Sequence, residues 1–333
     1  MTIPVTICDD SSFARKQLAR ALPENWDIEV TFASNGIEGL DAVRQNLAEV
    51  MFLDLTMPDL DGYGVLEAIT EAQLNSVVIV VSGDIQPEAK KRVLALGAID
   101  FIKKPVDSGQ LLEILNKFGL ISETLEGSNH ISADMGSAEV SLSNVYQEIA
   151  NVAMGQAADL LAQHLDAFIV LPVPSVNTIE ATELQMMLQS IGYSRNTSAV
   201  FQGFIGNRIA GEALLIFDHP DFEDMASLLK FEDEITRNVE VELMMDIASI
   251  LIGSFLKAYF RMLDVQFSQS HPKMLAENHI KDLTDKHEIA WKQTLSIEID
   301  YSIENHDVNC DLIILFAEDS IETMDKRVGF YAS

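Results

Sequence analysis

The stretch Val50-Met-Phe-Leu-Asp54-Leu-Thr-Met-Pro58-Asp-Leu-Asp-Gly62 decides the fold of the first third of the chain. Four apolar residues are followed directly by an aspartate, and a proline and a glycine come before the next helical pattern. A short apolar run bounded by turn residues is typical of a strand that is buried on both faces. The stretch therefore predicts a buried strand that ends at a carboxylate.

The same alternation of strand and helix patterns runs through residues 1–120. Apolar, β-rich runs lie at 3–8, 28–32, 50–53, 77–81 and 99–102, and helical patterns lie near 13–22, 36–47, 62–72, 87–96 and 109–118. Apolar strands that are each followed by a helix predict an α/β fold, a doubly wound (βα)5 parallel sheet covered on both faces. Functional residues of such sheets gather at the carboxyl ends of the strands.

Polar residues occupy those predicted strand ends: Asp9 and Asp10 follow the first strand, Asp54 the third, Ser82 ends the fourth and Lys104 follows the fifth. Three carboxylates at one edge repel each other unless a cation neutralises them, and oxygen ligands suit Mg²⁺. A hydroxyl and a lysine complement a phosphoryl group. An aspartate pair alone is commonly a helix N-cap. All five together predict a site where a carboxylate accepts phosphate beside Mg²⁺.

Residues 1–120 resemble a CheY-like receiver domain of two-component response regulators. The motifs that match are the Asp9-Asp10 pair, the stretch 54–62, Ser82-Gly83 and Phe101-Ile-Lys-Lys104-Pro105. The resemblance implies a histidine kinase as partner and Asp54 as the phosphoacceptor. It further implies Mg²⁺ bound by Asp10, Asp54 and the backbone carbonyl of Thr56, with Asp9 acting through water, phosphoryl oxygens bound by Ser82 and Lys104, and Phe101 at the switch position.

The composition indicates a globular, strongly acidic chain of about two domains. It has 333 residues, a net charge of −30, 48% hydrophobic and 22% charged residues. Because phosphate backbones are bound through Lys and Arg, this charge argues against a nucleic-acid partner. No apolar run reaches the ~18 residues of a membrane span, no signal peptide is evident, and the distant Cys8 and Cys310 fit a reducing compartment. We therefore expect a cytoplasmic protein without a membrane partner.

The charge and the composition both change near residue 122. Residues 1–122 carry 10 basic and 18 acidic side chains, whereas residues 123–333 carry 12 and 34. The segment 122–139 is poor in large apolar residues and contains Gly127 and Gly136 as breakers. We therefore predict a first domain at 1–121, a linker at 122–139 and a second domain at 140–333.

The second domain contains an internal repeat, with copies at about 140–230 and 238–330. Residues 148–155 (EIANVAMG) align with 246–253 (DIASILIG) at an offset of 98, and 213–217 align with 312–316 at 99. Each copy predicts a long helix, an extended segment, a strand hairpin and a closing helix, with hairpins at 197–206 and 208–217 and at 294–303 and 310–316. The repeat predicts a pseudo-twofold α/β (α+β) domain.

A polar stripe lies on the first long helix. Asn144, Glu148, Asn151 and Gly155 are spaced by 4, 3 and 4 residues and therefore share one face, while the residues beside them are apolar. Such a stripe is usually a solvated helix face. Asn and Gly are unfavourable inside a helix, however, so their presence favours a face that approaches another group closely.

Residues 140–330 resemble the CheC/CheX/FliY phosphatases that act on phosphorylated receivers. The family motif is Asp or Ser, then Glu, Asn and a later Pro, which here read Asn144, Glu148, Asn151 and Pro174. Asn144 departs from that motif, and Pro174 comes one residue late. The resemblance implies that Asn151 orients the hydrolytic water and that Glu148 pairs with the lysine of the receiver, without a metal in this domain.

The second copy carries Asp246 and Ser249 at the positions of the Glu and the Asn, so we expect a degenerate second site. The leading hypothesis is a response regulator whose output domain hydrolyses aspartyl phosphate on a partner regulator or on Asp54 itself, in cis or within a homodimer. The alternative is a non-catalytic docking module of chemotaxis or two-component signalling that responds to phosphorylation.

Overall fold

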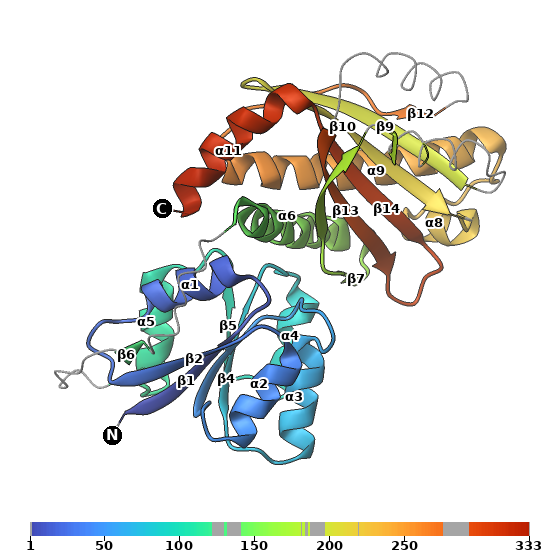
Figure 1. Ribbon diagram of the computed structural model, residues 1–333. Coiled ribbons are helices and arrows are strands. Elements are labelled where there is room, and N and C mark those ends of the chain that lie inside the picture. Colours follow the sequence, from blue (N-terminus) through green and yellow to red (C-terminus); the bar gives the residue numbers. More distant parts are fainter. Residues whose placement is uncertain are drawn as a thin grey trace. The chain divides into compact units, whose positions relative to one another are not determined.

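The computed structural model describes residues 2–121, 130–131, 141–180, 182–183, 186, 197–218, 220–275 and 293–332 (Figure 1). The chain divides into two compact units, Met1–Glu148 and Ile149–Ser333. The boundary falls inside one helix, α6 (Leu142–Leu165), so the beginning of this helix belongs to the first unit. Among the described residues, no helix is both long enough and apolar enough to cross a membrane.

The first unit contains a parallel sheet in the order β5-β4-β3-β1-β2-β6 (Figure 1). Its strands are β1 (Ile3–Cys8), β2 (Ile28–Ala33), β3 (Val50–Leu53), β4 (Val77–Ser82), β5 (Asp100–Lys103) and β6 (His130–Ile131). The predicted doubly wound sheet is confirmed. The short β6, which pairs with β2, lies in the segment 122–139 where the sequence predicts a linker. The rest of that segment lies outside the described residues.

Helices cover both faces of this sheet. α1 (Ser12–Ala21) and α5 (Ser108–Lys117) cover one face, and α2 (Gly36–Arg44), α3 (Gly62–Glu71) and α4 (Pro87–Ala95) cover the other (Figure 1). One apolar core joins Leu18 and Leu111 to the sheet, and the other joins Leu40, Val65 and Val93. Burial on both faces explains why the strands read as continuous apolar runs.

One predicted helix of the first unit is too long. The pattern at 36–47 predicts three residues more than α2 contains, because the helix ends at Arg44. Asn46 adopts a left-handed φ of 59°, and the Leu47 amide donates to the Ala42 carbonyl. The apolar Leu47 continues the sequence pattern, but it lies beyond the point where the backbone leaves the helix.

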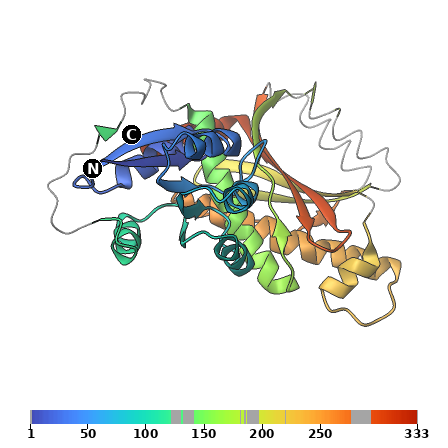
Figure 2. The same ribbon diagram turned by 90° about the horizontal axis from the view of Figure 1, so that it is seen from below.

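The second unit is a mixed α/β body with an antiparallel sheet in the order β11-β9-β10-β14-β13-β7. Its first repeat contains α6, β7 (Ile169–Val170), β8 (Ser175–Glu180), β9 (Thr197–Gly206), β10 (Ile209–Asp218) and α8 (Phe222–Leu228). Its second repeat contains α9 (Arg237–Met262), β11 (Ser268–Gln269), β12 (Lys273–Met274), β13 (Gln293–Ile303), β14 (Asn309–Phe316) and α11 (Glu318–Ala332). Both views show α6 and α9 next to each other on one side of this sheet (Figures 1 and 2).

The register of the two central strands fits a pseudo-twofold axis. β10 and β14 are antiparallel, and Leu214 lies opposite Ile313, its own equivalent at the sequence offset of 99. Ala213 lies opposite Ile314, and the equivalent pair joins Leu215 to Leu312. The pattern of one repeat therefore maps onto the other around the Leu214–Ile313 pair.

The two repeats also exchange outer strands. β8 of the first repeat pairs with β13 of the second, and β12 of the second pairs with β9 of the first. β7 and β11 follow the same exchange, pairing with β13 and β9. Each hairpin is thus extended by strands from the other repeat, so the sheet of the second unit requires both copies.

Candidate functional site

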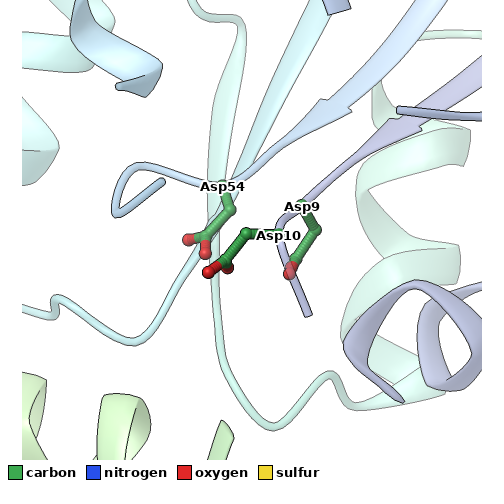
Figure 3. Close-up of side chains that lie close together, drawn as sticks. All are labelled: Asp9, Asp10 and Asp54. Carbon is green, nitrogen blue, oxygen red and sulfur yellow. The ribbon is translucent and has the colours of Figure 1, made fainter. Parts of the chain in front are cut away.

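Three carboxylates meet at the carboxyl ends of β1 and β3 (Figure 3). One oxygen from each of Asp9, Asp10 and Asp54 lies within 4.8 Å of the other two. Asp9 and Asp54 are buried, and Asp10 is partly buried. The cluster is the one metal-sized group of acidic ligands found among the described residues. The structure therefore brings together the three aspartates that the sequence predicts as metal ligands.

Strand register explains why these aspartates meet. β1 and β3 are neighbours, with Cys8 opposite Leu53, so the residues that follow them emerge side by side. The Asp54 amide donates to the Cys8 carbonyl at 2.9 Å, which continues the pairing past the strand ends. Ser11, rather than either aspartate, caps α1 by accepting from the Ala14 amide. The carboxylates at positions 9 and 10 are thus not used as helix caps.

Gly62 holds the beginning of α3 against the phosphoacceptor candidate. A Cβ at this position would lie 2.3 Å from the Asp54 carbonyl oxygen, closer than any ordinary contact. The Gly62 amide also donates to the Leu55 carbonyl at 3.0 Å. A glycine is therefore needed at position 62 for this close approach of two backbone segments.

Lys104 joins the carboxylate cluster from the end of β5. Its Nζ lies 2.7 Å from Asp9 Oδ2 and 3.0 Å from Asp54 Oδ2. Lys104 is 5% exposed, whereas the neighbouring Lys103 is exposed to solvent. The structure thus brings into the site the lysine that directly precedes Pro105, as the sequence motif predicts.

The other predicted site residues surround this cluster. Ser82 is fully buried at the end of β4, and its hydroxyl accepts a hydrogen bond from the Asp84 amide at 3.1 Å. Thr56 is buried two residues after Asp54. Phe101 is also buried, and it belongs to the apolar core between the sheet and the helices α2, α3 and α4.

The electrostatics of the cluster favour a cation. Burial, followed by the charges of Asp9 and Asp54, raises the pKa of Asp10 to about 7. Burial also raises the pKa of Asp54 to about 7, although Lys104 opposes this shift. Burial lowers the pKa of Lys104, but the surrounding carboxylates outweigh it and raise that pKa overall. Carboxylate oxygens in excess over the one lysine match the hard-ligand preference of Mg²⁺.

Sequence reasoning missed several polar residues that support the site. The Arg15 guanidinium donates to the carbonyls of both Asp9 and Asp10, the latter at 3.1 Å. Asp84 and Gln86 are buried in the loop after β4, where Asp84 Oδ1 accepts from the Gln86 amide and side chain. These side chains bind the chain's own groups and follow no strand directly, so no strand-end pattern identifies them.

Two residues of the α6 stripe contact side chains next to the carboxylate cluster, within the first unit. Glu148 Oε1 lies 3.3 Å from Lys104 Nζ, and Asn144 Nδ2 donates to Ser12 Oγ at 2.8 Å. Glu148 is 5% exposed, and its Oε2 has no hydrogen-bond partner in the part of the chain that is described. Burial raises the pKa of Glu148 to about 7, with Lys104 opposing.

The remaining motif residues lie in the second unit. Asn151 follows Glu148 by three residues on α6 and is buried. The equivalent residues of the second repeat, Asp246 and Ser249, are both exposed on α9. Ser249 Oγ donates to the Met245 carbonyl of its own helix at 2.8 Å.

Comparisons with known proteins match the first unit. Residues 5–116 match the family described as the response regulator receiver domain. Chemotaxis protein CheY of Treponema pallidum is 34% identical over 115 residues, which cover 33% of this chain and 77% of that protein. A protein-glutamate methylesterase/protein-glutamine glutaminase of Symbiobacterium thermophilum is 44% identical over 108 residues, 32% of this chain. The chain spans about a third of the length of such methylesterase relatives.

One solved structure is similar over more than half of the chain. FliY of Thermotoga maritima covers 57% of this chain and 96% of its own, at 17% identity and a TM-score of 0.42. That score is too low to carry an assignment of fold or function to the second unit.

A parallel sheet with three aspartates and a lysine at its strand ends is typical of the receiver domains of signalling proteins. The family match and the CheY relative show that the chain belongs to the response regulators, with its receiver domain at residues 5–116. Receiver domains work with histidine kinases in two-component signalling and bind Mg²⁺ through an acidic pocket, which the Asp9, Asp10 and Asp54 cluster matches.

Proposed function

We propose that this response regulator is phosphorylated on Asp54 by a histidine kinase and that its output domain hydrolyses aspartyl phosphate on a receiver domain. The proposed receiver spans 1–121, the linker 122–139 and the phosphatase domain 140–333. The ion pair between Glu148 and Lys104 carries the proposal, because a carboxylate of the phosphatase motif contacts the lysine of a receiver site.

The proposed receiver chemistry uses the strand-end cluster. Asp10, Asp54 and the Thr56 carbonyl would hold Mg²⁺, with Asp9 acting through water. The bound ion supplies charge neutralisation to the phosphoryl group. Ser82 and Lys104 would then bind phosphoryl oxygens, which requires the Lys104 ammonium to exchange part of its contact with Asp54 for the new group.

The proposed phosphatase chemistry depends on positioning. Hydrolysis of aspartyl phosphate needs a water in line with phosphorus, and a carboxamide can orient that water without competing as a nucleophile. Asn151 takes this role, while Glu148 pairs with the receiver lysine and fixes the docked geometry. The phosphatase domain needs no metal of its own in this scheme. Asp246 and Ser249 serve as a degenerate, structural second copy.

The lifetime of phosphorylated Asp54 tests this proposal. The chain would be phosphorylated with a small-molecule phosphodonor and Mg²⁺, the donor removed, and the remaining phosphoprotein followed by Phos-tag electrophoresis. Because Asn151 orients the water, Asn151→Ala should lengthen the lifetime by about 10- to 100-fold. Ser249→Ala, the matched change on the exposed stripe of α9, should stay within about twofold of the wild type. Equal lifetimes of all three chains and of added partner receivers would refute the catalytic role.

A non-catalytic docking module is the second candidate. The features that favour it are Asn144, which departs from the phosphatase motif, and Pro174, which comes one residue late. In this case phosphorylation would switch partner binding, and Glu148→Ala would change binding without changing the phosphate lifetime. Binding and lifetime measured on the same variant separate the two candidates.

A further inference from the structure

Two side chains at the beginning of α6 contact the receiver site of the same chain. Glu148 reaches Lys104, and one helical turn earlier Asn144 donates to Ser12 in the first turn of α1. The two contacts involve different receiver elements, since Lys104 follows β5 and Ser12 follows β1. The beginning of α6 thus contacts two different elements around the same site.

The two contacts differ in what they can recognise. The lysine contacted by Glu148 belongs to the phosphoryl-binding chemistry that the proposed function assigns to receivers in general, so this ion pair cannot tell one receiver from another. Ser12 lies beside the carboxylate cluster but has no part in that chemistry. A hydrogen bond to Ser12 at 2.8 Å can therefore distinguish this receiver from one with another residue at that position.

We propose that the aspartyl phosphate hydrolysed by this chain is its own, on Asp54 and in cis, and that the Asn144–Ser12 hydrogen bond is the contact that selects it. This inference rests on the proposed phosphatase function. Asn144 is a positioning residue in this scheme, because it touches Ser12 and no reacting atom. The Asn144 amide group donates to the Ser12 hydroxyl, which an ionised carboxylate at this position could not do.

The reaction leaves the chain unchanged and able to be phosphorylated again. The water oxygen forms a new bond to phosphorus while the bond between phosphorus and the Asp54 carboxylate oxygen breaks. Asp54 leaves as a carboxylate, and both protons of the water remain with the inorganic phosphate. The hydrolysis consumes water and no oxidant, reductant or nucleotide. A cis reaction of this kind would make the phosphorylated state self-limiting in time.

Mixing and dilution experiments test whether the reaction is intramolecular. In cis, the decay rate constant of phosphorylated wild type should not change over a roughly 100-fold range of concentration. Phosphorylated Asn151→Ala chain should also keep its long lifetime when an excess of Asp54→Asn chain is added. Acceleration by the Asp54→Asn chain, or a rate that rises with concentration, would overturn the cis assignment while leaving the phosphatase function intact. Equal lifetimes of wild type and Asn151→Ala would instead refute the underlying function.

A double-mutant cycle tests the selecting contact. Asn144→Ala and Ser12→Ala should each lengthen the lifetime by roughly three- to tenfold, and the double variant should be no slower than either single one. Ser143→Ala, at the exposed neighbouring position, is the control and should match the wild type. Effects that multiply in the double variant would show that the two residues act separately. Circular dichroism of each variant checks that the fold is retained.

Discussion

The two long helices of the duplicated unit carry equivalent polar stripes in very different surroundings. On α6, Glu148 and Asn151 are 5% and 6% exposed, and Glu148 contacts Lys104. On α9, the equivalent Asp246 and Ser249 face solvent, and the Ser249 hydroxyl is satisfied within its own helix. The two repeats therefore share a scaffold but differ in the surroundings of the stripe.

The difference shows what burial demands of a polar stripe. A buried carboxylate is costly unless it finds a cation, and Lys104 provides one for Glu148. An exposed carboxylate such as Asp246 is satisfied by water and needs no partner. A shorter carboxylate and a hydroxyl in place of the carboxamide are thus tolerated on α9, whereas Glu148 on α6 contacts Lys104.

The largest effect on stability is expected in the two central strands, where equivalent positions of the two repeats should respond alike. Leu215 in β10 and Ile314 in β14 are equivalent positions, and both are fully buried. Truncation of either one to alanine should lower the free energy of unfolding by about 2–5 kcal/mol, through lost burial and a cavity. Urea unfolding followed by circular dichroism measures both variants. Losses of stability that differ by more than about 2 kcal/mol would show that the two repeats are not energetically equivalent.

A smaller effect separates the two stripes through the metal site. Mg²⁺ at about 100 times its Kd should raise the free energy of unfolding by about 2.7 kcal/mol. Glu148→Gln should weaken Mg²⁺ binding by roughly two- to fivefold, because it removes a negative charge near the carboxylates. Asp246→Asn, the matched exposed change, should leave the binding curve unaltered. Thermal unfolding at a series of Mg²⁺ concentrations gives these curves, and equal shifts for both variants would contradict the comparison.

Thermal unfolding with and without Mg²⁺ should also depend on pH, with opposite trends for the metal-free stability and for the Mg²⁺ effect. Without metal, the pKa values of Asp10 and Asp54 are raised to about 7, so the native state holds protons that the unfolded chain releases. The metal-free protein should therefore lose stability as the pH rises from about 4 to about 7, and this loss should level off above about pH 8. Mg²⁺ must displace those protons, so its stabilisation should be full above about pH 8 and should shrink as the pH falls through 7. A Mg²⁺ effect that grows at lower pH would argue against these carboxylates as ligands.

The smallest expected effect concerns the glycine at the end of each stripe, Gly155 on α6 and Gly253 on α9. A Cβ on Gly253 of α9 would meet only the Gln269 side chain among the described residues, at ordinary distances of 3.5 Å to Nε2 and 3.9 Å to Oε1. Gly253→Ala should therefore raise the free energy of unfolding by up to about 1 kcal/mol, through better helix propensity. Gly155→Ala, the matched change at a buried position of α6, should gain less. Calorimetry measures the free energy of unfolding of the two variants. An equal gain in stability would mean that both helix faces have equal room for a methyl group.

Much of the receiver site follows from sequence because parallel strands place their ends in register. Asp9 and Asp54 come directly after apolar runs, and Lys104 directly follows β5, so a strand pattern is enough to gather them. The repeat was equally predictable, since an offset of 99 residues places Leu214 opposite its equivalent Ile313. Periodic and strand-end patterns determine such features before any long-range contact is known.

Other features could not be predicted because they depend on three-dimensional contacts without a local pattern. Arg15 binds backbone carbonyls, which every residue has, so nothing in the sequence marks its targets. The Asn144–Ser12 hydrogen bond joins residues 132 positions apart. The exchange of β8 and β12 between repeats is likewise a choice of partner among strands with similar patterns.

That strand exchange has a consequence for synthesis of the chain on the ribosome. Val176 in β8 pairs with Ile297 in β13, which is translated 121 residues later. At the usual speed of translation, the first repeat would wait roughly 6 to 24 s for its partner strand, while the receiver ahead of it already has every strand of its five-stranded core. The nascent chain would thus present unpaired strand edges during that interval. Binding of a ribosome-associated chaperone is expected to matter most there.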